Sequence, residues 1–459
     1  MINSEKIEGF RLSPQQKHLW LLAQENPSSY YRTQGSFLLK GVLDKECLLK
    51  SLTLTIERLE ILRTAFYNLP EMTIPLQVIK APYLPVVEQY NCQKDSKEKQ
   101  LNKLEAIFNE RLQRPLDIEK LPFLEVALIE LSVNEIILVI SLPSLCADRS
   151  SLSYLMAEIV SCYDQQESEV TRDEPFQYID FSEWQNELLE STETLAGREY
   201  WQQENTRENI SLELPLSRQN YRELVSDFEP KFVSVTLEQQ QLESLKDLAQ
   251  KYQVSEQDWL LSCFLILLSR MTSQEEISLG LACDNRHYED LSQSIGLMTK
   301  YLPLSVTLDY SLSFVNFCQQ IAQKNKDFSQ WQDYFIPQVG ELVKQGITFE
   351  VDLNANKNIH LTDLDWSLIQ QFSCLQPYQL NVCCLRYAQN IEIEFHYNSN
   401  SFSSEVIENW LQNYCTLLMN VSANPRQKIE ALDILTDQQK ERILLQFNPS
   451  LVTQKSENY

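Results

Sequence analysis

Helix-like and strand-like segments alternate along both halves of this chain, and this alternation constrains the fold more than any other feature. In the first half, a helical pattern at 45–62 is followed by strand patterns at 123–131 and 135–143. In the second half, a strand pattern at 232–237 precedes a capped helical pattern at 255–271. The presence of helical and strand periodicities in each half favours an α/β fold in which helices cover sheets.

Shorter patterns complete this alternation. Helices are expected at 12–24, 242–252, 404–423 and 436–447, and strands at 35–43, 64–67, 75–80, 276–283 and 391–398.

The length of the chain predicts more than one folding unit. Its 459 residues exceed what one hydrophobic core usually supports, so we expect two lobes of similar size. Residues 1–185 are assigned to an N-terminal lobe and residues 232–435 to a C-terminal lobe. The polar stretch 186–231 would cross between the lobes, and residues 436–459 would form a linker helix and a polar tail.

The charge of the chain excludes several kinds of partner. The formal net charge is −25 at pH 7, and such a surface repels nucleic acids and anionic membranes. The amino terminus lacks the apolar segment of a signal peptide, and the longest apolar run, at 259–268, is too short to span a bilayer. The eleven cysteines show no CxxC pairing, which is typical of reduced thiols. We therefore expect a soluble cytoplasmic protein that binds neither nucleic acid nor membrane.

Several catalytic and cofactor motifs are absent from the sequence. The eight glycines form no GxGxxG or P-loop, and neither GxSxG nor HExxH occurs. The four histidines have no metal-ligand spacing to one another or to cysteine; they are His18, His287, His360 and His396. We therefore expect no metal and no intrinsically bound cofactor.

The candidate catalytic residues lie where the strand at 135–143 passes into a helical pattern, in the sequence SLPSLCADRSSL (141–152). A polar loop between a strand and a helix is a common place for chemistry. This loop contains no histidine, and its candidates are Ser144, Cys146, Asp148 and Ser151.

Each candidate has both a catalytic and a structural interpretation. Ser144 cannot be an unaided general base, but it could donate a hydrogen bond to an oxyanion or simply cap the loop. Cys146 lies near a helix amino terminus, which stabilises a thiolate, whereas the nearby Asp148 opposes one; packing is the alternative. Asp148 and Ser151 also suit the positive start of a helix without any catalytic role.

Six segments occur in an order that carries a family resemblance. They are LSPQQKHLWLL (12–22), RLEILRTAF (58–66), SLPSLCADRSSL (141–152), YIDFSEWQ (178–185), SIGLMTKYLPL (294–304) and QWQDYF (330–335). In this order, from about residue 10 to residue 435, they resemble the condensation domains of nonribosomal peptide synthetases. Leu59 and Trp331 stand where that family carries histidine.

The resemblance implies a fold and an activity. The fold would consist of two chloramphenicol-acetyltransferase-like lobes, arranged as a V-shaped pseudo-dimer with an active-site tunnel between them. The activity would be acyl transfer, in which an acceptor amine or hydroxyl attacks a donor acyl or peptidyl thioester. Donor and acceptor carrier proteins would present both groups on 4'-phosphopantetheine arms. Residues 436–448 resemble the linker helix before an adenylation domain, a further possible partner, and the chain is expected to act as a monomer.

The loop departs from the His-His-x-x-x-Asp-Gly motif of this family. Alignment on Asp148 puts Pro143 and Ser144 in place of the two histidines, and Arg149 in place of the glycine. The second histidine usually orients the acceptor or takes its proton, so the departure removes the expected base.

The family's motif aspartate is usually structural and paired with an arginine. The resemblance therefore implies such a partner for Asp148, with three candidates, Arg58, Arg63 and Arg286.

Three hypotheses remain open from the sequence. The chain could be an atypical condensation domain that works mainly by positioning its substrates. It could instead have lost catalysis and serve as a platform that docks carrier proteins or recruits a tailoring enzyme. A free-standing acyltransferase for a small soluble acceptor is the third, for which the sequence supplies no separate support.

Overall fold

The computed structural model describes most of the chain. The described residues are 8–25, 27–69, 72–121, 123–164, 174–205, 212–215, 217, 228–337, 346–352, 358–360, 364–387 and 390–447.

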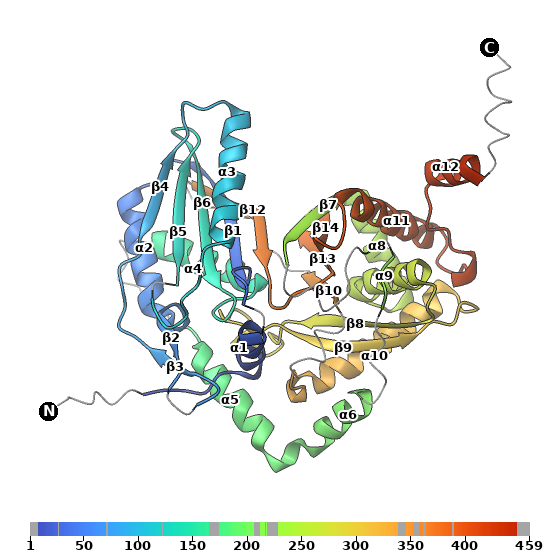
Figure 1. Ribbon diagram of the computed structural model, residues 1–459, viewed down its shortest axis with the longest axis horizontal. Helices are drawn as coiled ribbons and strands as arrows, with labels where there is room; N and C mark the ends of the chain where they lie inside the picture. Colours follow the sequence, from blue (N-terminus) through green and yellow to red (C-terminus); the bar gives the residue numbers. More distant parts are fainter. Residues whose placement is uncertain are drawn as a thin grey trace.

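Two six-stranded sheets form the centres of two lobes that lie side by side (Figure 1). The N-terminal sheet has the order β11-β12-β1-β6-β5-β4, and the C-terminal sheet has the order β7-β14-β13-β10-β8-β9. The strands of the first sheet are β1 (Arg32–Gly41), β4 (Val87–Asn91), β5 (Glu125–Glu130), β6 (Glu135–Pro143), β11 (Asn358–His360) and β12 (Leu364–Ser373). Those of the second are β7 (Pro230–Leu237), β8 (Glu276–Cys283), β9 (Lys300–Thr307), β10 (Ile347–Asp352), β13 (Leu380–Tyr387) and β14 (Asn390–Asn398).

Helices cover these sheets, and a small hairpin of β2 (Thr64–Tyr67) and β3 (Leu76–Ile79) lies beside the first. The helices of the first half are α1 (Pro14–Glu25), α2 (Lys45–Arg58), α3 (Lys97–Leu112), α4 (Arg149–Asp164), α5 (Tyr178–Glu190) and α6 (Leu195–Asn205). Those of the second half are α8 (Gln239–Tyr252), α9 (Glu256–Thr272), α10 (Phe314–Trp331), α11 (Ser404–Ala423) and α12 (Asp437–Phe447). The predicted α/β class is confirmed.

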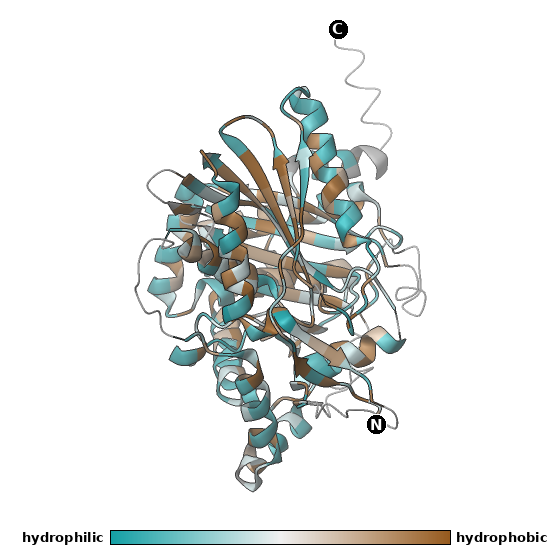
Figure 2. Ribbon diagram, turned by 90° about the vertical axis from the view of Figure 1, so that its left-hand side faces the viewer, coloured by the Kyte–Doolittle hydropathy of each residue, from teal (hydrophilic) through white to brown (hydrophobic). Residues whose placement is uncertain are grey.

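Local sequence signals explain why these elements form. The apolar run at 259–268 lies in α9, where its side chains are at most 1% exposed. Ser255 caps this helix, because its Oγ accepts the Asp258 N–H at 3.0 Å while Asp258 Oδ2 accepts the Ser255 N–H at 2.8 Å. Figure 2 shows hydrophobic residues concentrated in the strands, whereas the outer helices carry residues of both kinds. Among the described residues, no helix combines the length and apolarity needed to cross a membrane.

The C-terminal half also contributes to the N-terminal sheet. β12 pairs antiparallel with β1, with Thr33 opposite Ser373 and Gly41 opposite Leu364. β6 occupies the other side of β1. The range 232–435, assigned by sequence to one lobe, therefore supplies strands to both sheets, and a boundary based on contiguous sequence does not follow the sheets at this point.

Candidate active site at the junction of the two sheets

The predicted strand-loop-helix junction is present. β6 ends at Pro143 and α4 begins at Arg149. The candidate side chains at this junction are all 0% exposed, namely Ser144, Cys146, Asp148 and Ser151. Because buried polar groups must find partners within the protein, the contacts of these side chains indicate their roles.

Asp148 is the centre of a hydrogen-bond network that joins the two halves of the chain. Its carboxylate accepts both terminal nitrogens of Arg286, at 2.8 and 2.9 Å. It also accepts the backbone N–H groups of Met298 and Thr299, at 3.0 and 2.9 Å, and the Ser151 hydroxyl at 2.6 Å. Burial opposes ionisation, but Arg286 and the other donors hold the pKa of Asp148 below its ordinary value. The network makes Asp148 a charged anchor for the C-terminal half.

Arg286 is the one of the three candidate arginines that contacts Asp148. Arg58 instead pairs with Glu158, with 2.7 Å between Nε and Oε1. Glu158 lies ten residues after Asp148, which places it about 15 Å from the loop along the axis of α4. Arg63 donates to a backbone carbonyl next to β3 at 2.8 Å. The sequence left three arginines open as the partner of Asp148, and the structure brings Arg286 to it, whereas Arg58 and Arg63 have the other partners just described.

A glycine allows the segment that carries Arg286 to approach the first lobe. Gly296 has a φ of 153°, and a Cβ there would lie 1.9 Å from a ring carbon of Tyr178. The Tyr178 hydroxyl lies 2.7 Å from Ser13 Oγ and donates to the Leu297 carbonyl at 2.7 Å. A side chain at Gly296 would push the segment 284–299 away from the loop.

Ser144 holds two strand ends together. Its hydroxyl donates to the carbonyl of Cys374, just after β12, at 2.9 Å. Its backbone N–H donates to the carbonyl of Tyr31, just before β1, at 3.0 Å. The hydroxyl proton is already engaged in a buried bond, which favours the structural interpretation over oxyanion stabilisation.

Cys146 has the environment of a packing residue. Its side chain belongs to the N-terminal hydrophobic core and is 0% exposed. Burial raises the pKa of the thiol well above its ordinary value, because the thiolate would lose its hydration. A covalent role for Cys146 is therefore not favoured by this geometry.

We expect Cys146 to resist alkylation by iodoacetamide in the folded protein at pH 8 and to react once the protein is unfolded in guanidinium. The reason is that the reagent cannot reach the buried side chain, and that the raised pKa keeps the thiol protonated. Peptide mass spectrometry of native and unfolded samples would measure the modified fraction. Rapid modification of Cys146 in the folded state would contradict the assignment.

Arg149 forms a buried ion-pair cluster with the opposite lobe. Its side chain is 2% exposed, with Nε 3.2 Å from Glu350 Oε1 and Nη1 3.7 Å from Glu394 Oε2. Nη2 donates toward Cys383 Sγ at 3.3 Å, and Glu394 also contacts His396 Nε2 at 2.7 Å. The guanidinium therefore fills space between the sheets that a glycine would leave open.

The partners of Arg149 in this cluster were not predicted from the sequence. A usable signal is the alternation of polar residues along β14, where Glu392, Glu394 and His396 interrupt a buried apolar strand. Ligand atoms of Cys383, Glu394 and His396 lie within 4.8 Å of one another, a spacing that could hold a metal ion. The Arg149 guanidinium already supplies a positive charge at this place.

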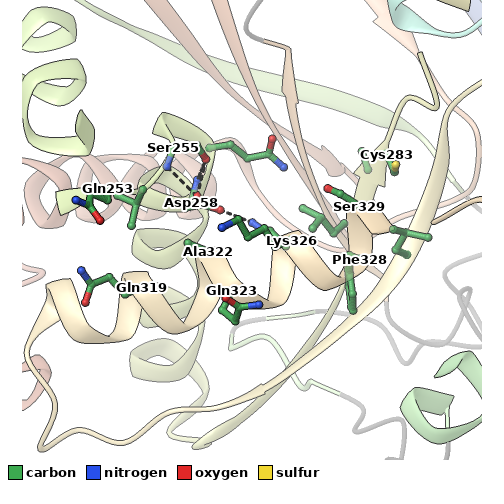
Figure 3. Close-up of a pocket in the computed structure, with 16 residues that line it drawn as sticks. Gln253, Ser255, Asp258, Cys283, Gln319, Ala322, Gln323, Lys326, Phe328 and Ser329 are labelled. Carbon is green, nitrogen blue, oxygen red and sulfur yellow. Dashed lines mark hydrogen bonds between the residues drawn. The ribbon is translucent and has the colours of Figure 1, made fainter. Parts of the chain in front are cut away.

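Two cavities differ in whether the loop lines them. One of about 440 Å³ is lined in part by Pro143 and Leu145, which flank Ser144. Another, of about 560 Å³, lies between α9, α10 and strands β8 and β9, and its lining residues all belong to 253–329 (Figure 3). The continuous tunnel implied by the resemblance stays a prediction.

Solved structures share this fold. The first condensation domain of the calcium-dependent antibiotic synthetase superposes with a TM-score of 0.80 and 16% sequence identity, covering 93% of this chain and 99% of that chain. The X-domain in its complex with OxyB from teicoplanin biosynthesis gives a TM-score of 0.75 at 19% identity, covering 94% of this chain and 97% of that one. The two-sheet architecture is thus that of the condensation domains, a chloramphenicol-acetyltransferase-like fold.

Sequence comparison identifies the family. The model of the condensation domain matches residues 7–444, so the chain belongs to the condensation domain family. It is 25% identical over 452 residues to gramicidin S synthase 2 of Aneurinibacillus migulanus, covering 96% of this chain and 10% of that protein. It is also 25% identical over 456 residues to surfactin synthase subunit 1 of Bacillus subtilis (strain 168), covering 96% of this chain and 12% of that protein. The chain therefore spans about a tenth of the length of these curated relatives.

Proposed function

We propose that this chain is an atypical condensation domain of a nonribosomal peptide synthetase. It joins a donor acyl or peptidyl thioester to an acceptor amine, or less readily a hydroxyl, in the cytoplasm. Donor and acceptor carrier proteins present these groups on 4'-phosphopantetheine arms, and an adenylation domain is a further partner. The domain itself needs no bound cofactor and acts as a monomer.

The observation that carries this proposal is the Asp148–Arg286 pair, with contacts of 2.8 and 2.9 Å between the halves. In this proposal Asp148 corresponds to the family's structural aspartate, and Arg286 is the arginine partner that the resemblance implies. Maintaining a buried ion pair requires good geometry, since each charge loses its hydration. A preserved junction between the lobes supports a chain that still positions two substrates.

Positioning can sustain the reaction without an imidazole. The acceptor nitrogen forms a bond to the thioester carbonyl carbon, the carbon–sulfur bond breaks, and the leaving thiolate takes up the proton that nitrogen loses. General-base assistance contributes about a hundred- to ten-thousand-fold. Fixed orientation of two reactants contributes effective molarities of about 10⁵ M or more. An amine, the stronger nucleophile, tolerates the missing base better than a hydroxyl does.

A second candidate function is supported by the sealed loop. All four motif-region candidates, Ser144, Cys146, Asp148 and Ser151, are 0% exposed, and no imidazole lies in the loop. The fold is also similar to that of an X-domain solved in complex with OxyB. In this alternative, the domain docks carrier proteins or recruits a tailoring enzyme without joining substrates.

The test is a reconstituted assay in which loaded donor and acceptor carrier proteins are mixed with the domain and products are followed by mass spectrometry. We expect amide product with an amine acceptor, and Ser144→Ala and Cys146→Ala variants whose rates fall far less than the about hundredfold loss caused by removing a general base.

A motif-intact condensation domain tested with its own carriers controls for the assay. Carrier binding without product from any amine acceptor would refute condensation and leave the platform as the function. Release of the donor group only when an acceptor carrier is present would refute the platform.

A further inference from the structure

Three neighbouring strands of the C-terminal sheet bring metal-binding side chains to one place. In the register of this sheet, Glu350 of β10 is opposite Cys383 of β13, and Cys383 is opposite Glu394 of β14. His396 follows Glu394 by two residues, so both point to the same face of the sheet. Side chains fixed on paired strands hold their relative positions more precisely than side chains on loops do. This face therefore carries a preorganised set of thiol, carboxylate and imidazole groups.

The surroundings of Cys383 differ from those of a packing cysteine. Cys383 and Cys384 are both 0% exposed, but successive residues of a strand face opposite sides of the sheet. Cys384 belongs to the large hydrophobic core of the C-terminal lobe, whereas Cys383 lies outside the two large cores of the described residues. The Sγ of Cys383 lies 3.3 Å from Arg149 Nη2 and 3.5 Å from Glu350 Oε2. Its thiol thus faces polar groups.

The distances between these groups fit a tetrahedral zinc ion. One ligand atom each of Cys383, Glu394 and His396 lies within 4.8 Å of the others. Zinc bonds of about 2.0 Å to nitrogen or oxygen and about 2.3 Å to sulfur place tetrahedral ligands about 3.3–3.5 Å apart. Small side-chain rotations would therefore close the set around an ion. Glu350 Oε2, beside the Cys383 thiol, is available as a fourth ligand.

The Arg149 guanidinium is compatible with an ion at this place. It contacts Glu350 at 3.2 Å and Glu394 at 3.7 Å, and it contributes a single positive charge. A zinc ion ionises a thiol that coordinates it, so the thiolate and the two carboxylates would each carry a negative charge. The divalent ion and the guanidinium together balance these charges. A neutral cluster suits a buried position, where charges must be paired or bound to a metal.

We propose that Cys383, Glu394 and His396 bind a zinc ion, with Glu350 as the fourth ligand. The thiol proton leaves to solvent, and His396 Nε2 exchanges its contact with Glu394 for the metal. A site closed by four protein ligands is structural, and this one braces the C-terminal sheet where Arg149 of the first lobe meets it. The ion takes no part in the proposed condensation, so either proposal can fail without the other.

Sequence spacing does not predict this site. Cys383 and His396 meet only through the pairing of β13 with β14, and Glu350 joins them from a third strand.

Metal content of the full chain tests the site. The protein would be expressed with zinc in the medium, passed over a chelating resin and assayed by inductively coupled plasma mass spectrometry. We expect about one zinc per chain. Cys383→Ala should lower the zinc affinity about a hundredfold or more, since even residues that only orient metal ligands contribute about 10- to 100-fold. Cys384→Ala, the adjacent and equally buried control, should keep the ion.

Cobalt in place of zinc gives a readout of the thiolate itself. We expect a sulfur-to-cobalt charge-transfer band in the near ultraviolet for the wild type and for Cys384→Ala, and none for Cys383→Ala. His396→Gln is the second variant if Cys383→Ala does not fold, as judged by circular dichroism, and it should lower the zinc affinity about tenfold or more.

Arg149→Met should bind zinc at least about tenfold more tightly in competition with a chromophoric chelator, because a nearby positive charge is removed. The stability of Arg149 variants is measured with a chelator present, so that zinc does not contribute. A wild type without zinc, zinc kept equally by Cys383→Ala, a cobalt spectrum without the sulfur band, or an unchanged affinity in Arg149→Met would overturn the assignment.

Discussion

Replacing Asp148 with alanine is expected to lower the free energy of unfolding by about 3–5 kcal/mol, because it leaves the buried Arg286 guanidinium without its counter-charge. The side chains of the pair are 0% and 3% exposed, so solvent provides little compensation. The Met298 and Thr299 N–H groups would also lose their acceptor. Chemical denaturation followed by circular dichroism measures the loss.

The matched control is Asp117→Ala, which removes an exposed carboxylate paired with Lys120 and should leave stability unchanged. An unfolding energy for Asp148→Ala within error of the wild type would contradict the anchor role. The charge of Asp148 should also make the stability of the protein depend on pH. Because the pKa of Asp148 is lowered in the folded protein, its contribution is present above the unfolded pKa of about 4 and is lost as pH falls through the folded value. The stability difference between wild type and Asp148→Asn should therefore shrink on acidification below pH 4.

Replacing Arg149 with methionine is expected to cost about 3 kcal/mol, since Glu350 and Glu394 would remain buried without their shared cation. Methionine keeps a similar volume and removes the charge, so the loss reports electrostatics more than packing. Denaturation at pH 7 provides the measurement.

A triple variant separates the two effects. Adding Glu350→Gln and Glu394→Gln to Arg149→Met removes the unpaired charges and should recover most of the lost stability. Replacing a whole buried charge cluster by neutral residues often leaves stability unchanged or higher. A triple variant no more stable than Arg149→Met alone would show that the guanidinium acts through packing.

Features that depend on near neighbours in sequence were predictable. The helix α9 and its Ser255 cap follow from an apolar run preceded by a serine and carboxylates. The junction of β6 and α4 was predicted from a buried strand pattern and a polar loop. The sequence therefore placed the loop between the right strand and helix.

Features that depend on distant pairing were not predictable from patterns alone. Asp148 and Arg286 are 138 residues apart, and only the fold chooses Arg286 over Arg58. Likewise, nothing in the local pattern of residues 364–373 shows that β12 joins the sheet of the first half rather than that of its neighbours in sequence. Glu350 and Glu394 lie on strands β10 and β14 of the other sheet, far from Arg149 in sequence. Because topology decides which strands meet, the buried Arg149 cluster could not be predicted from local patterns.

The position of β12 has a consequence for how the protein is made. Until residue 364 leaves the ribosome, β1 has no partner on one side, although it becomes an interior strand of the finished sheet. At translation speeds of about 5–20 residues per second, the 322 residues between Gly41 and Leu364 keep that strand edge bare for roughly 15 to 65 seconds. A bare edge invites pairing with other nascent chains, so expression as two separate fragments should yield aggregates of the first, and slower growth with chaperone support should favour intact material.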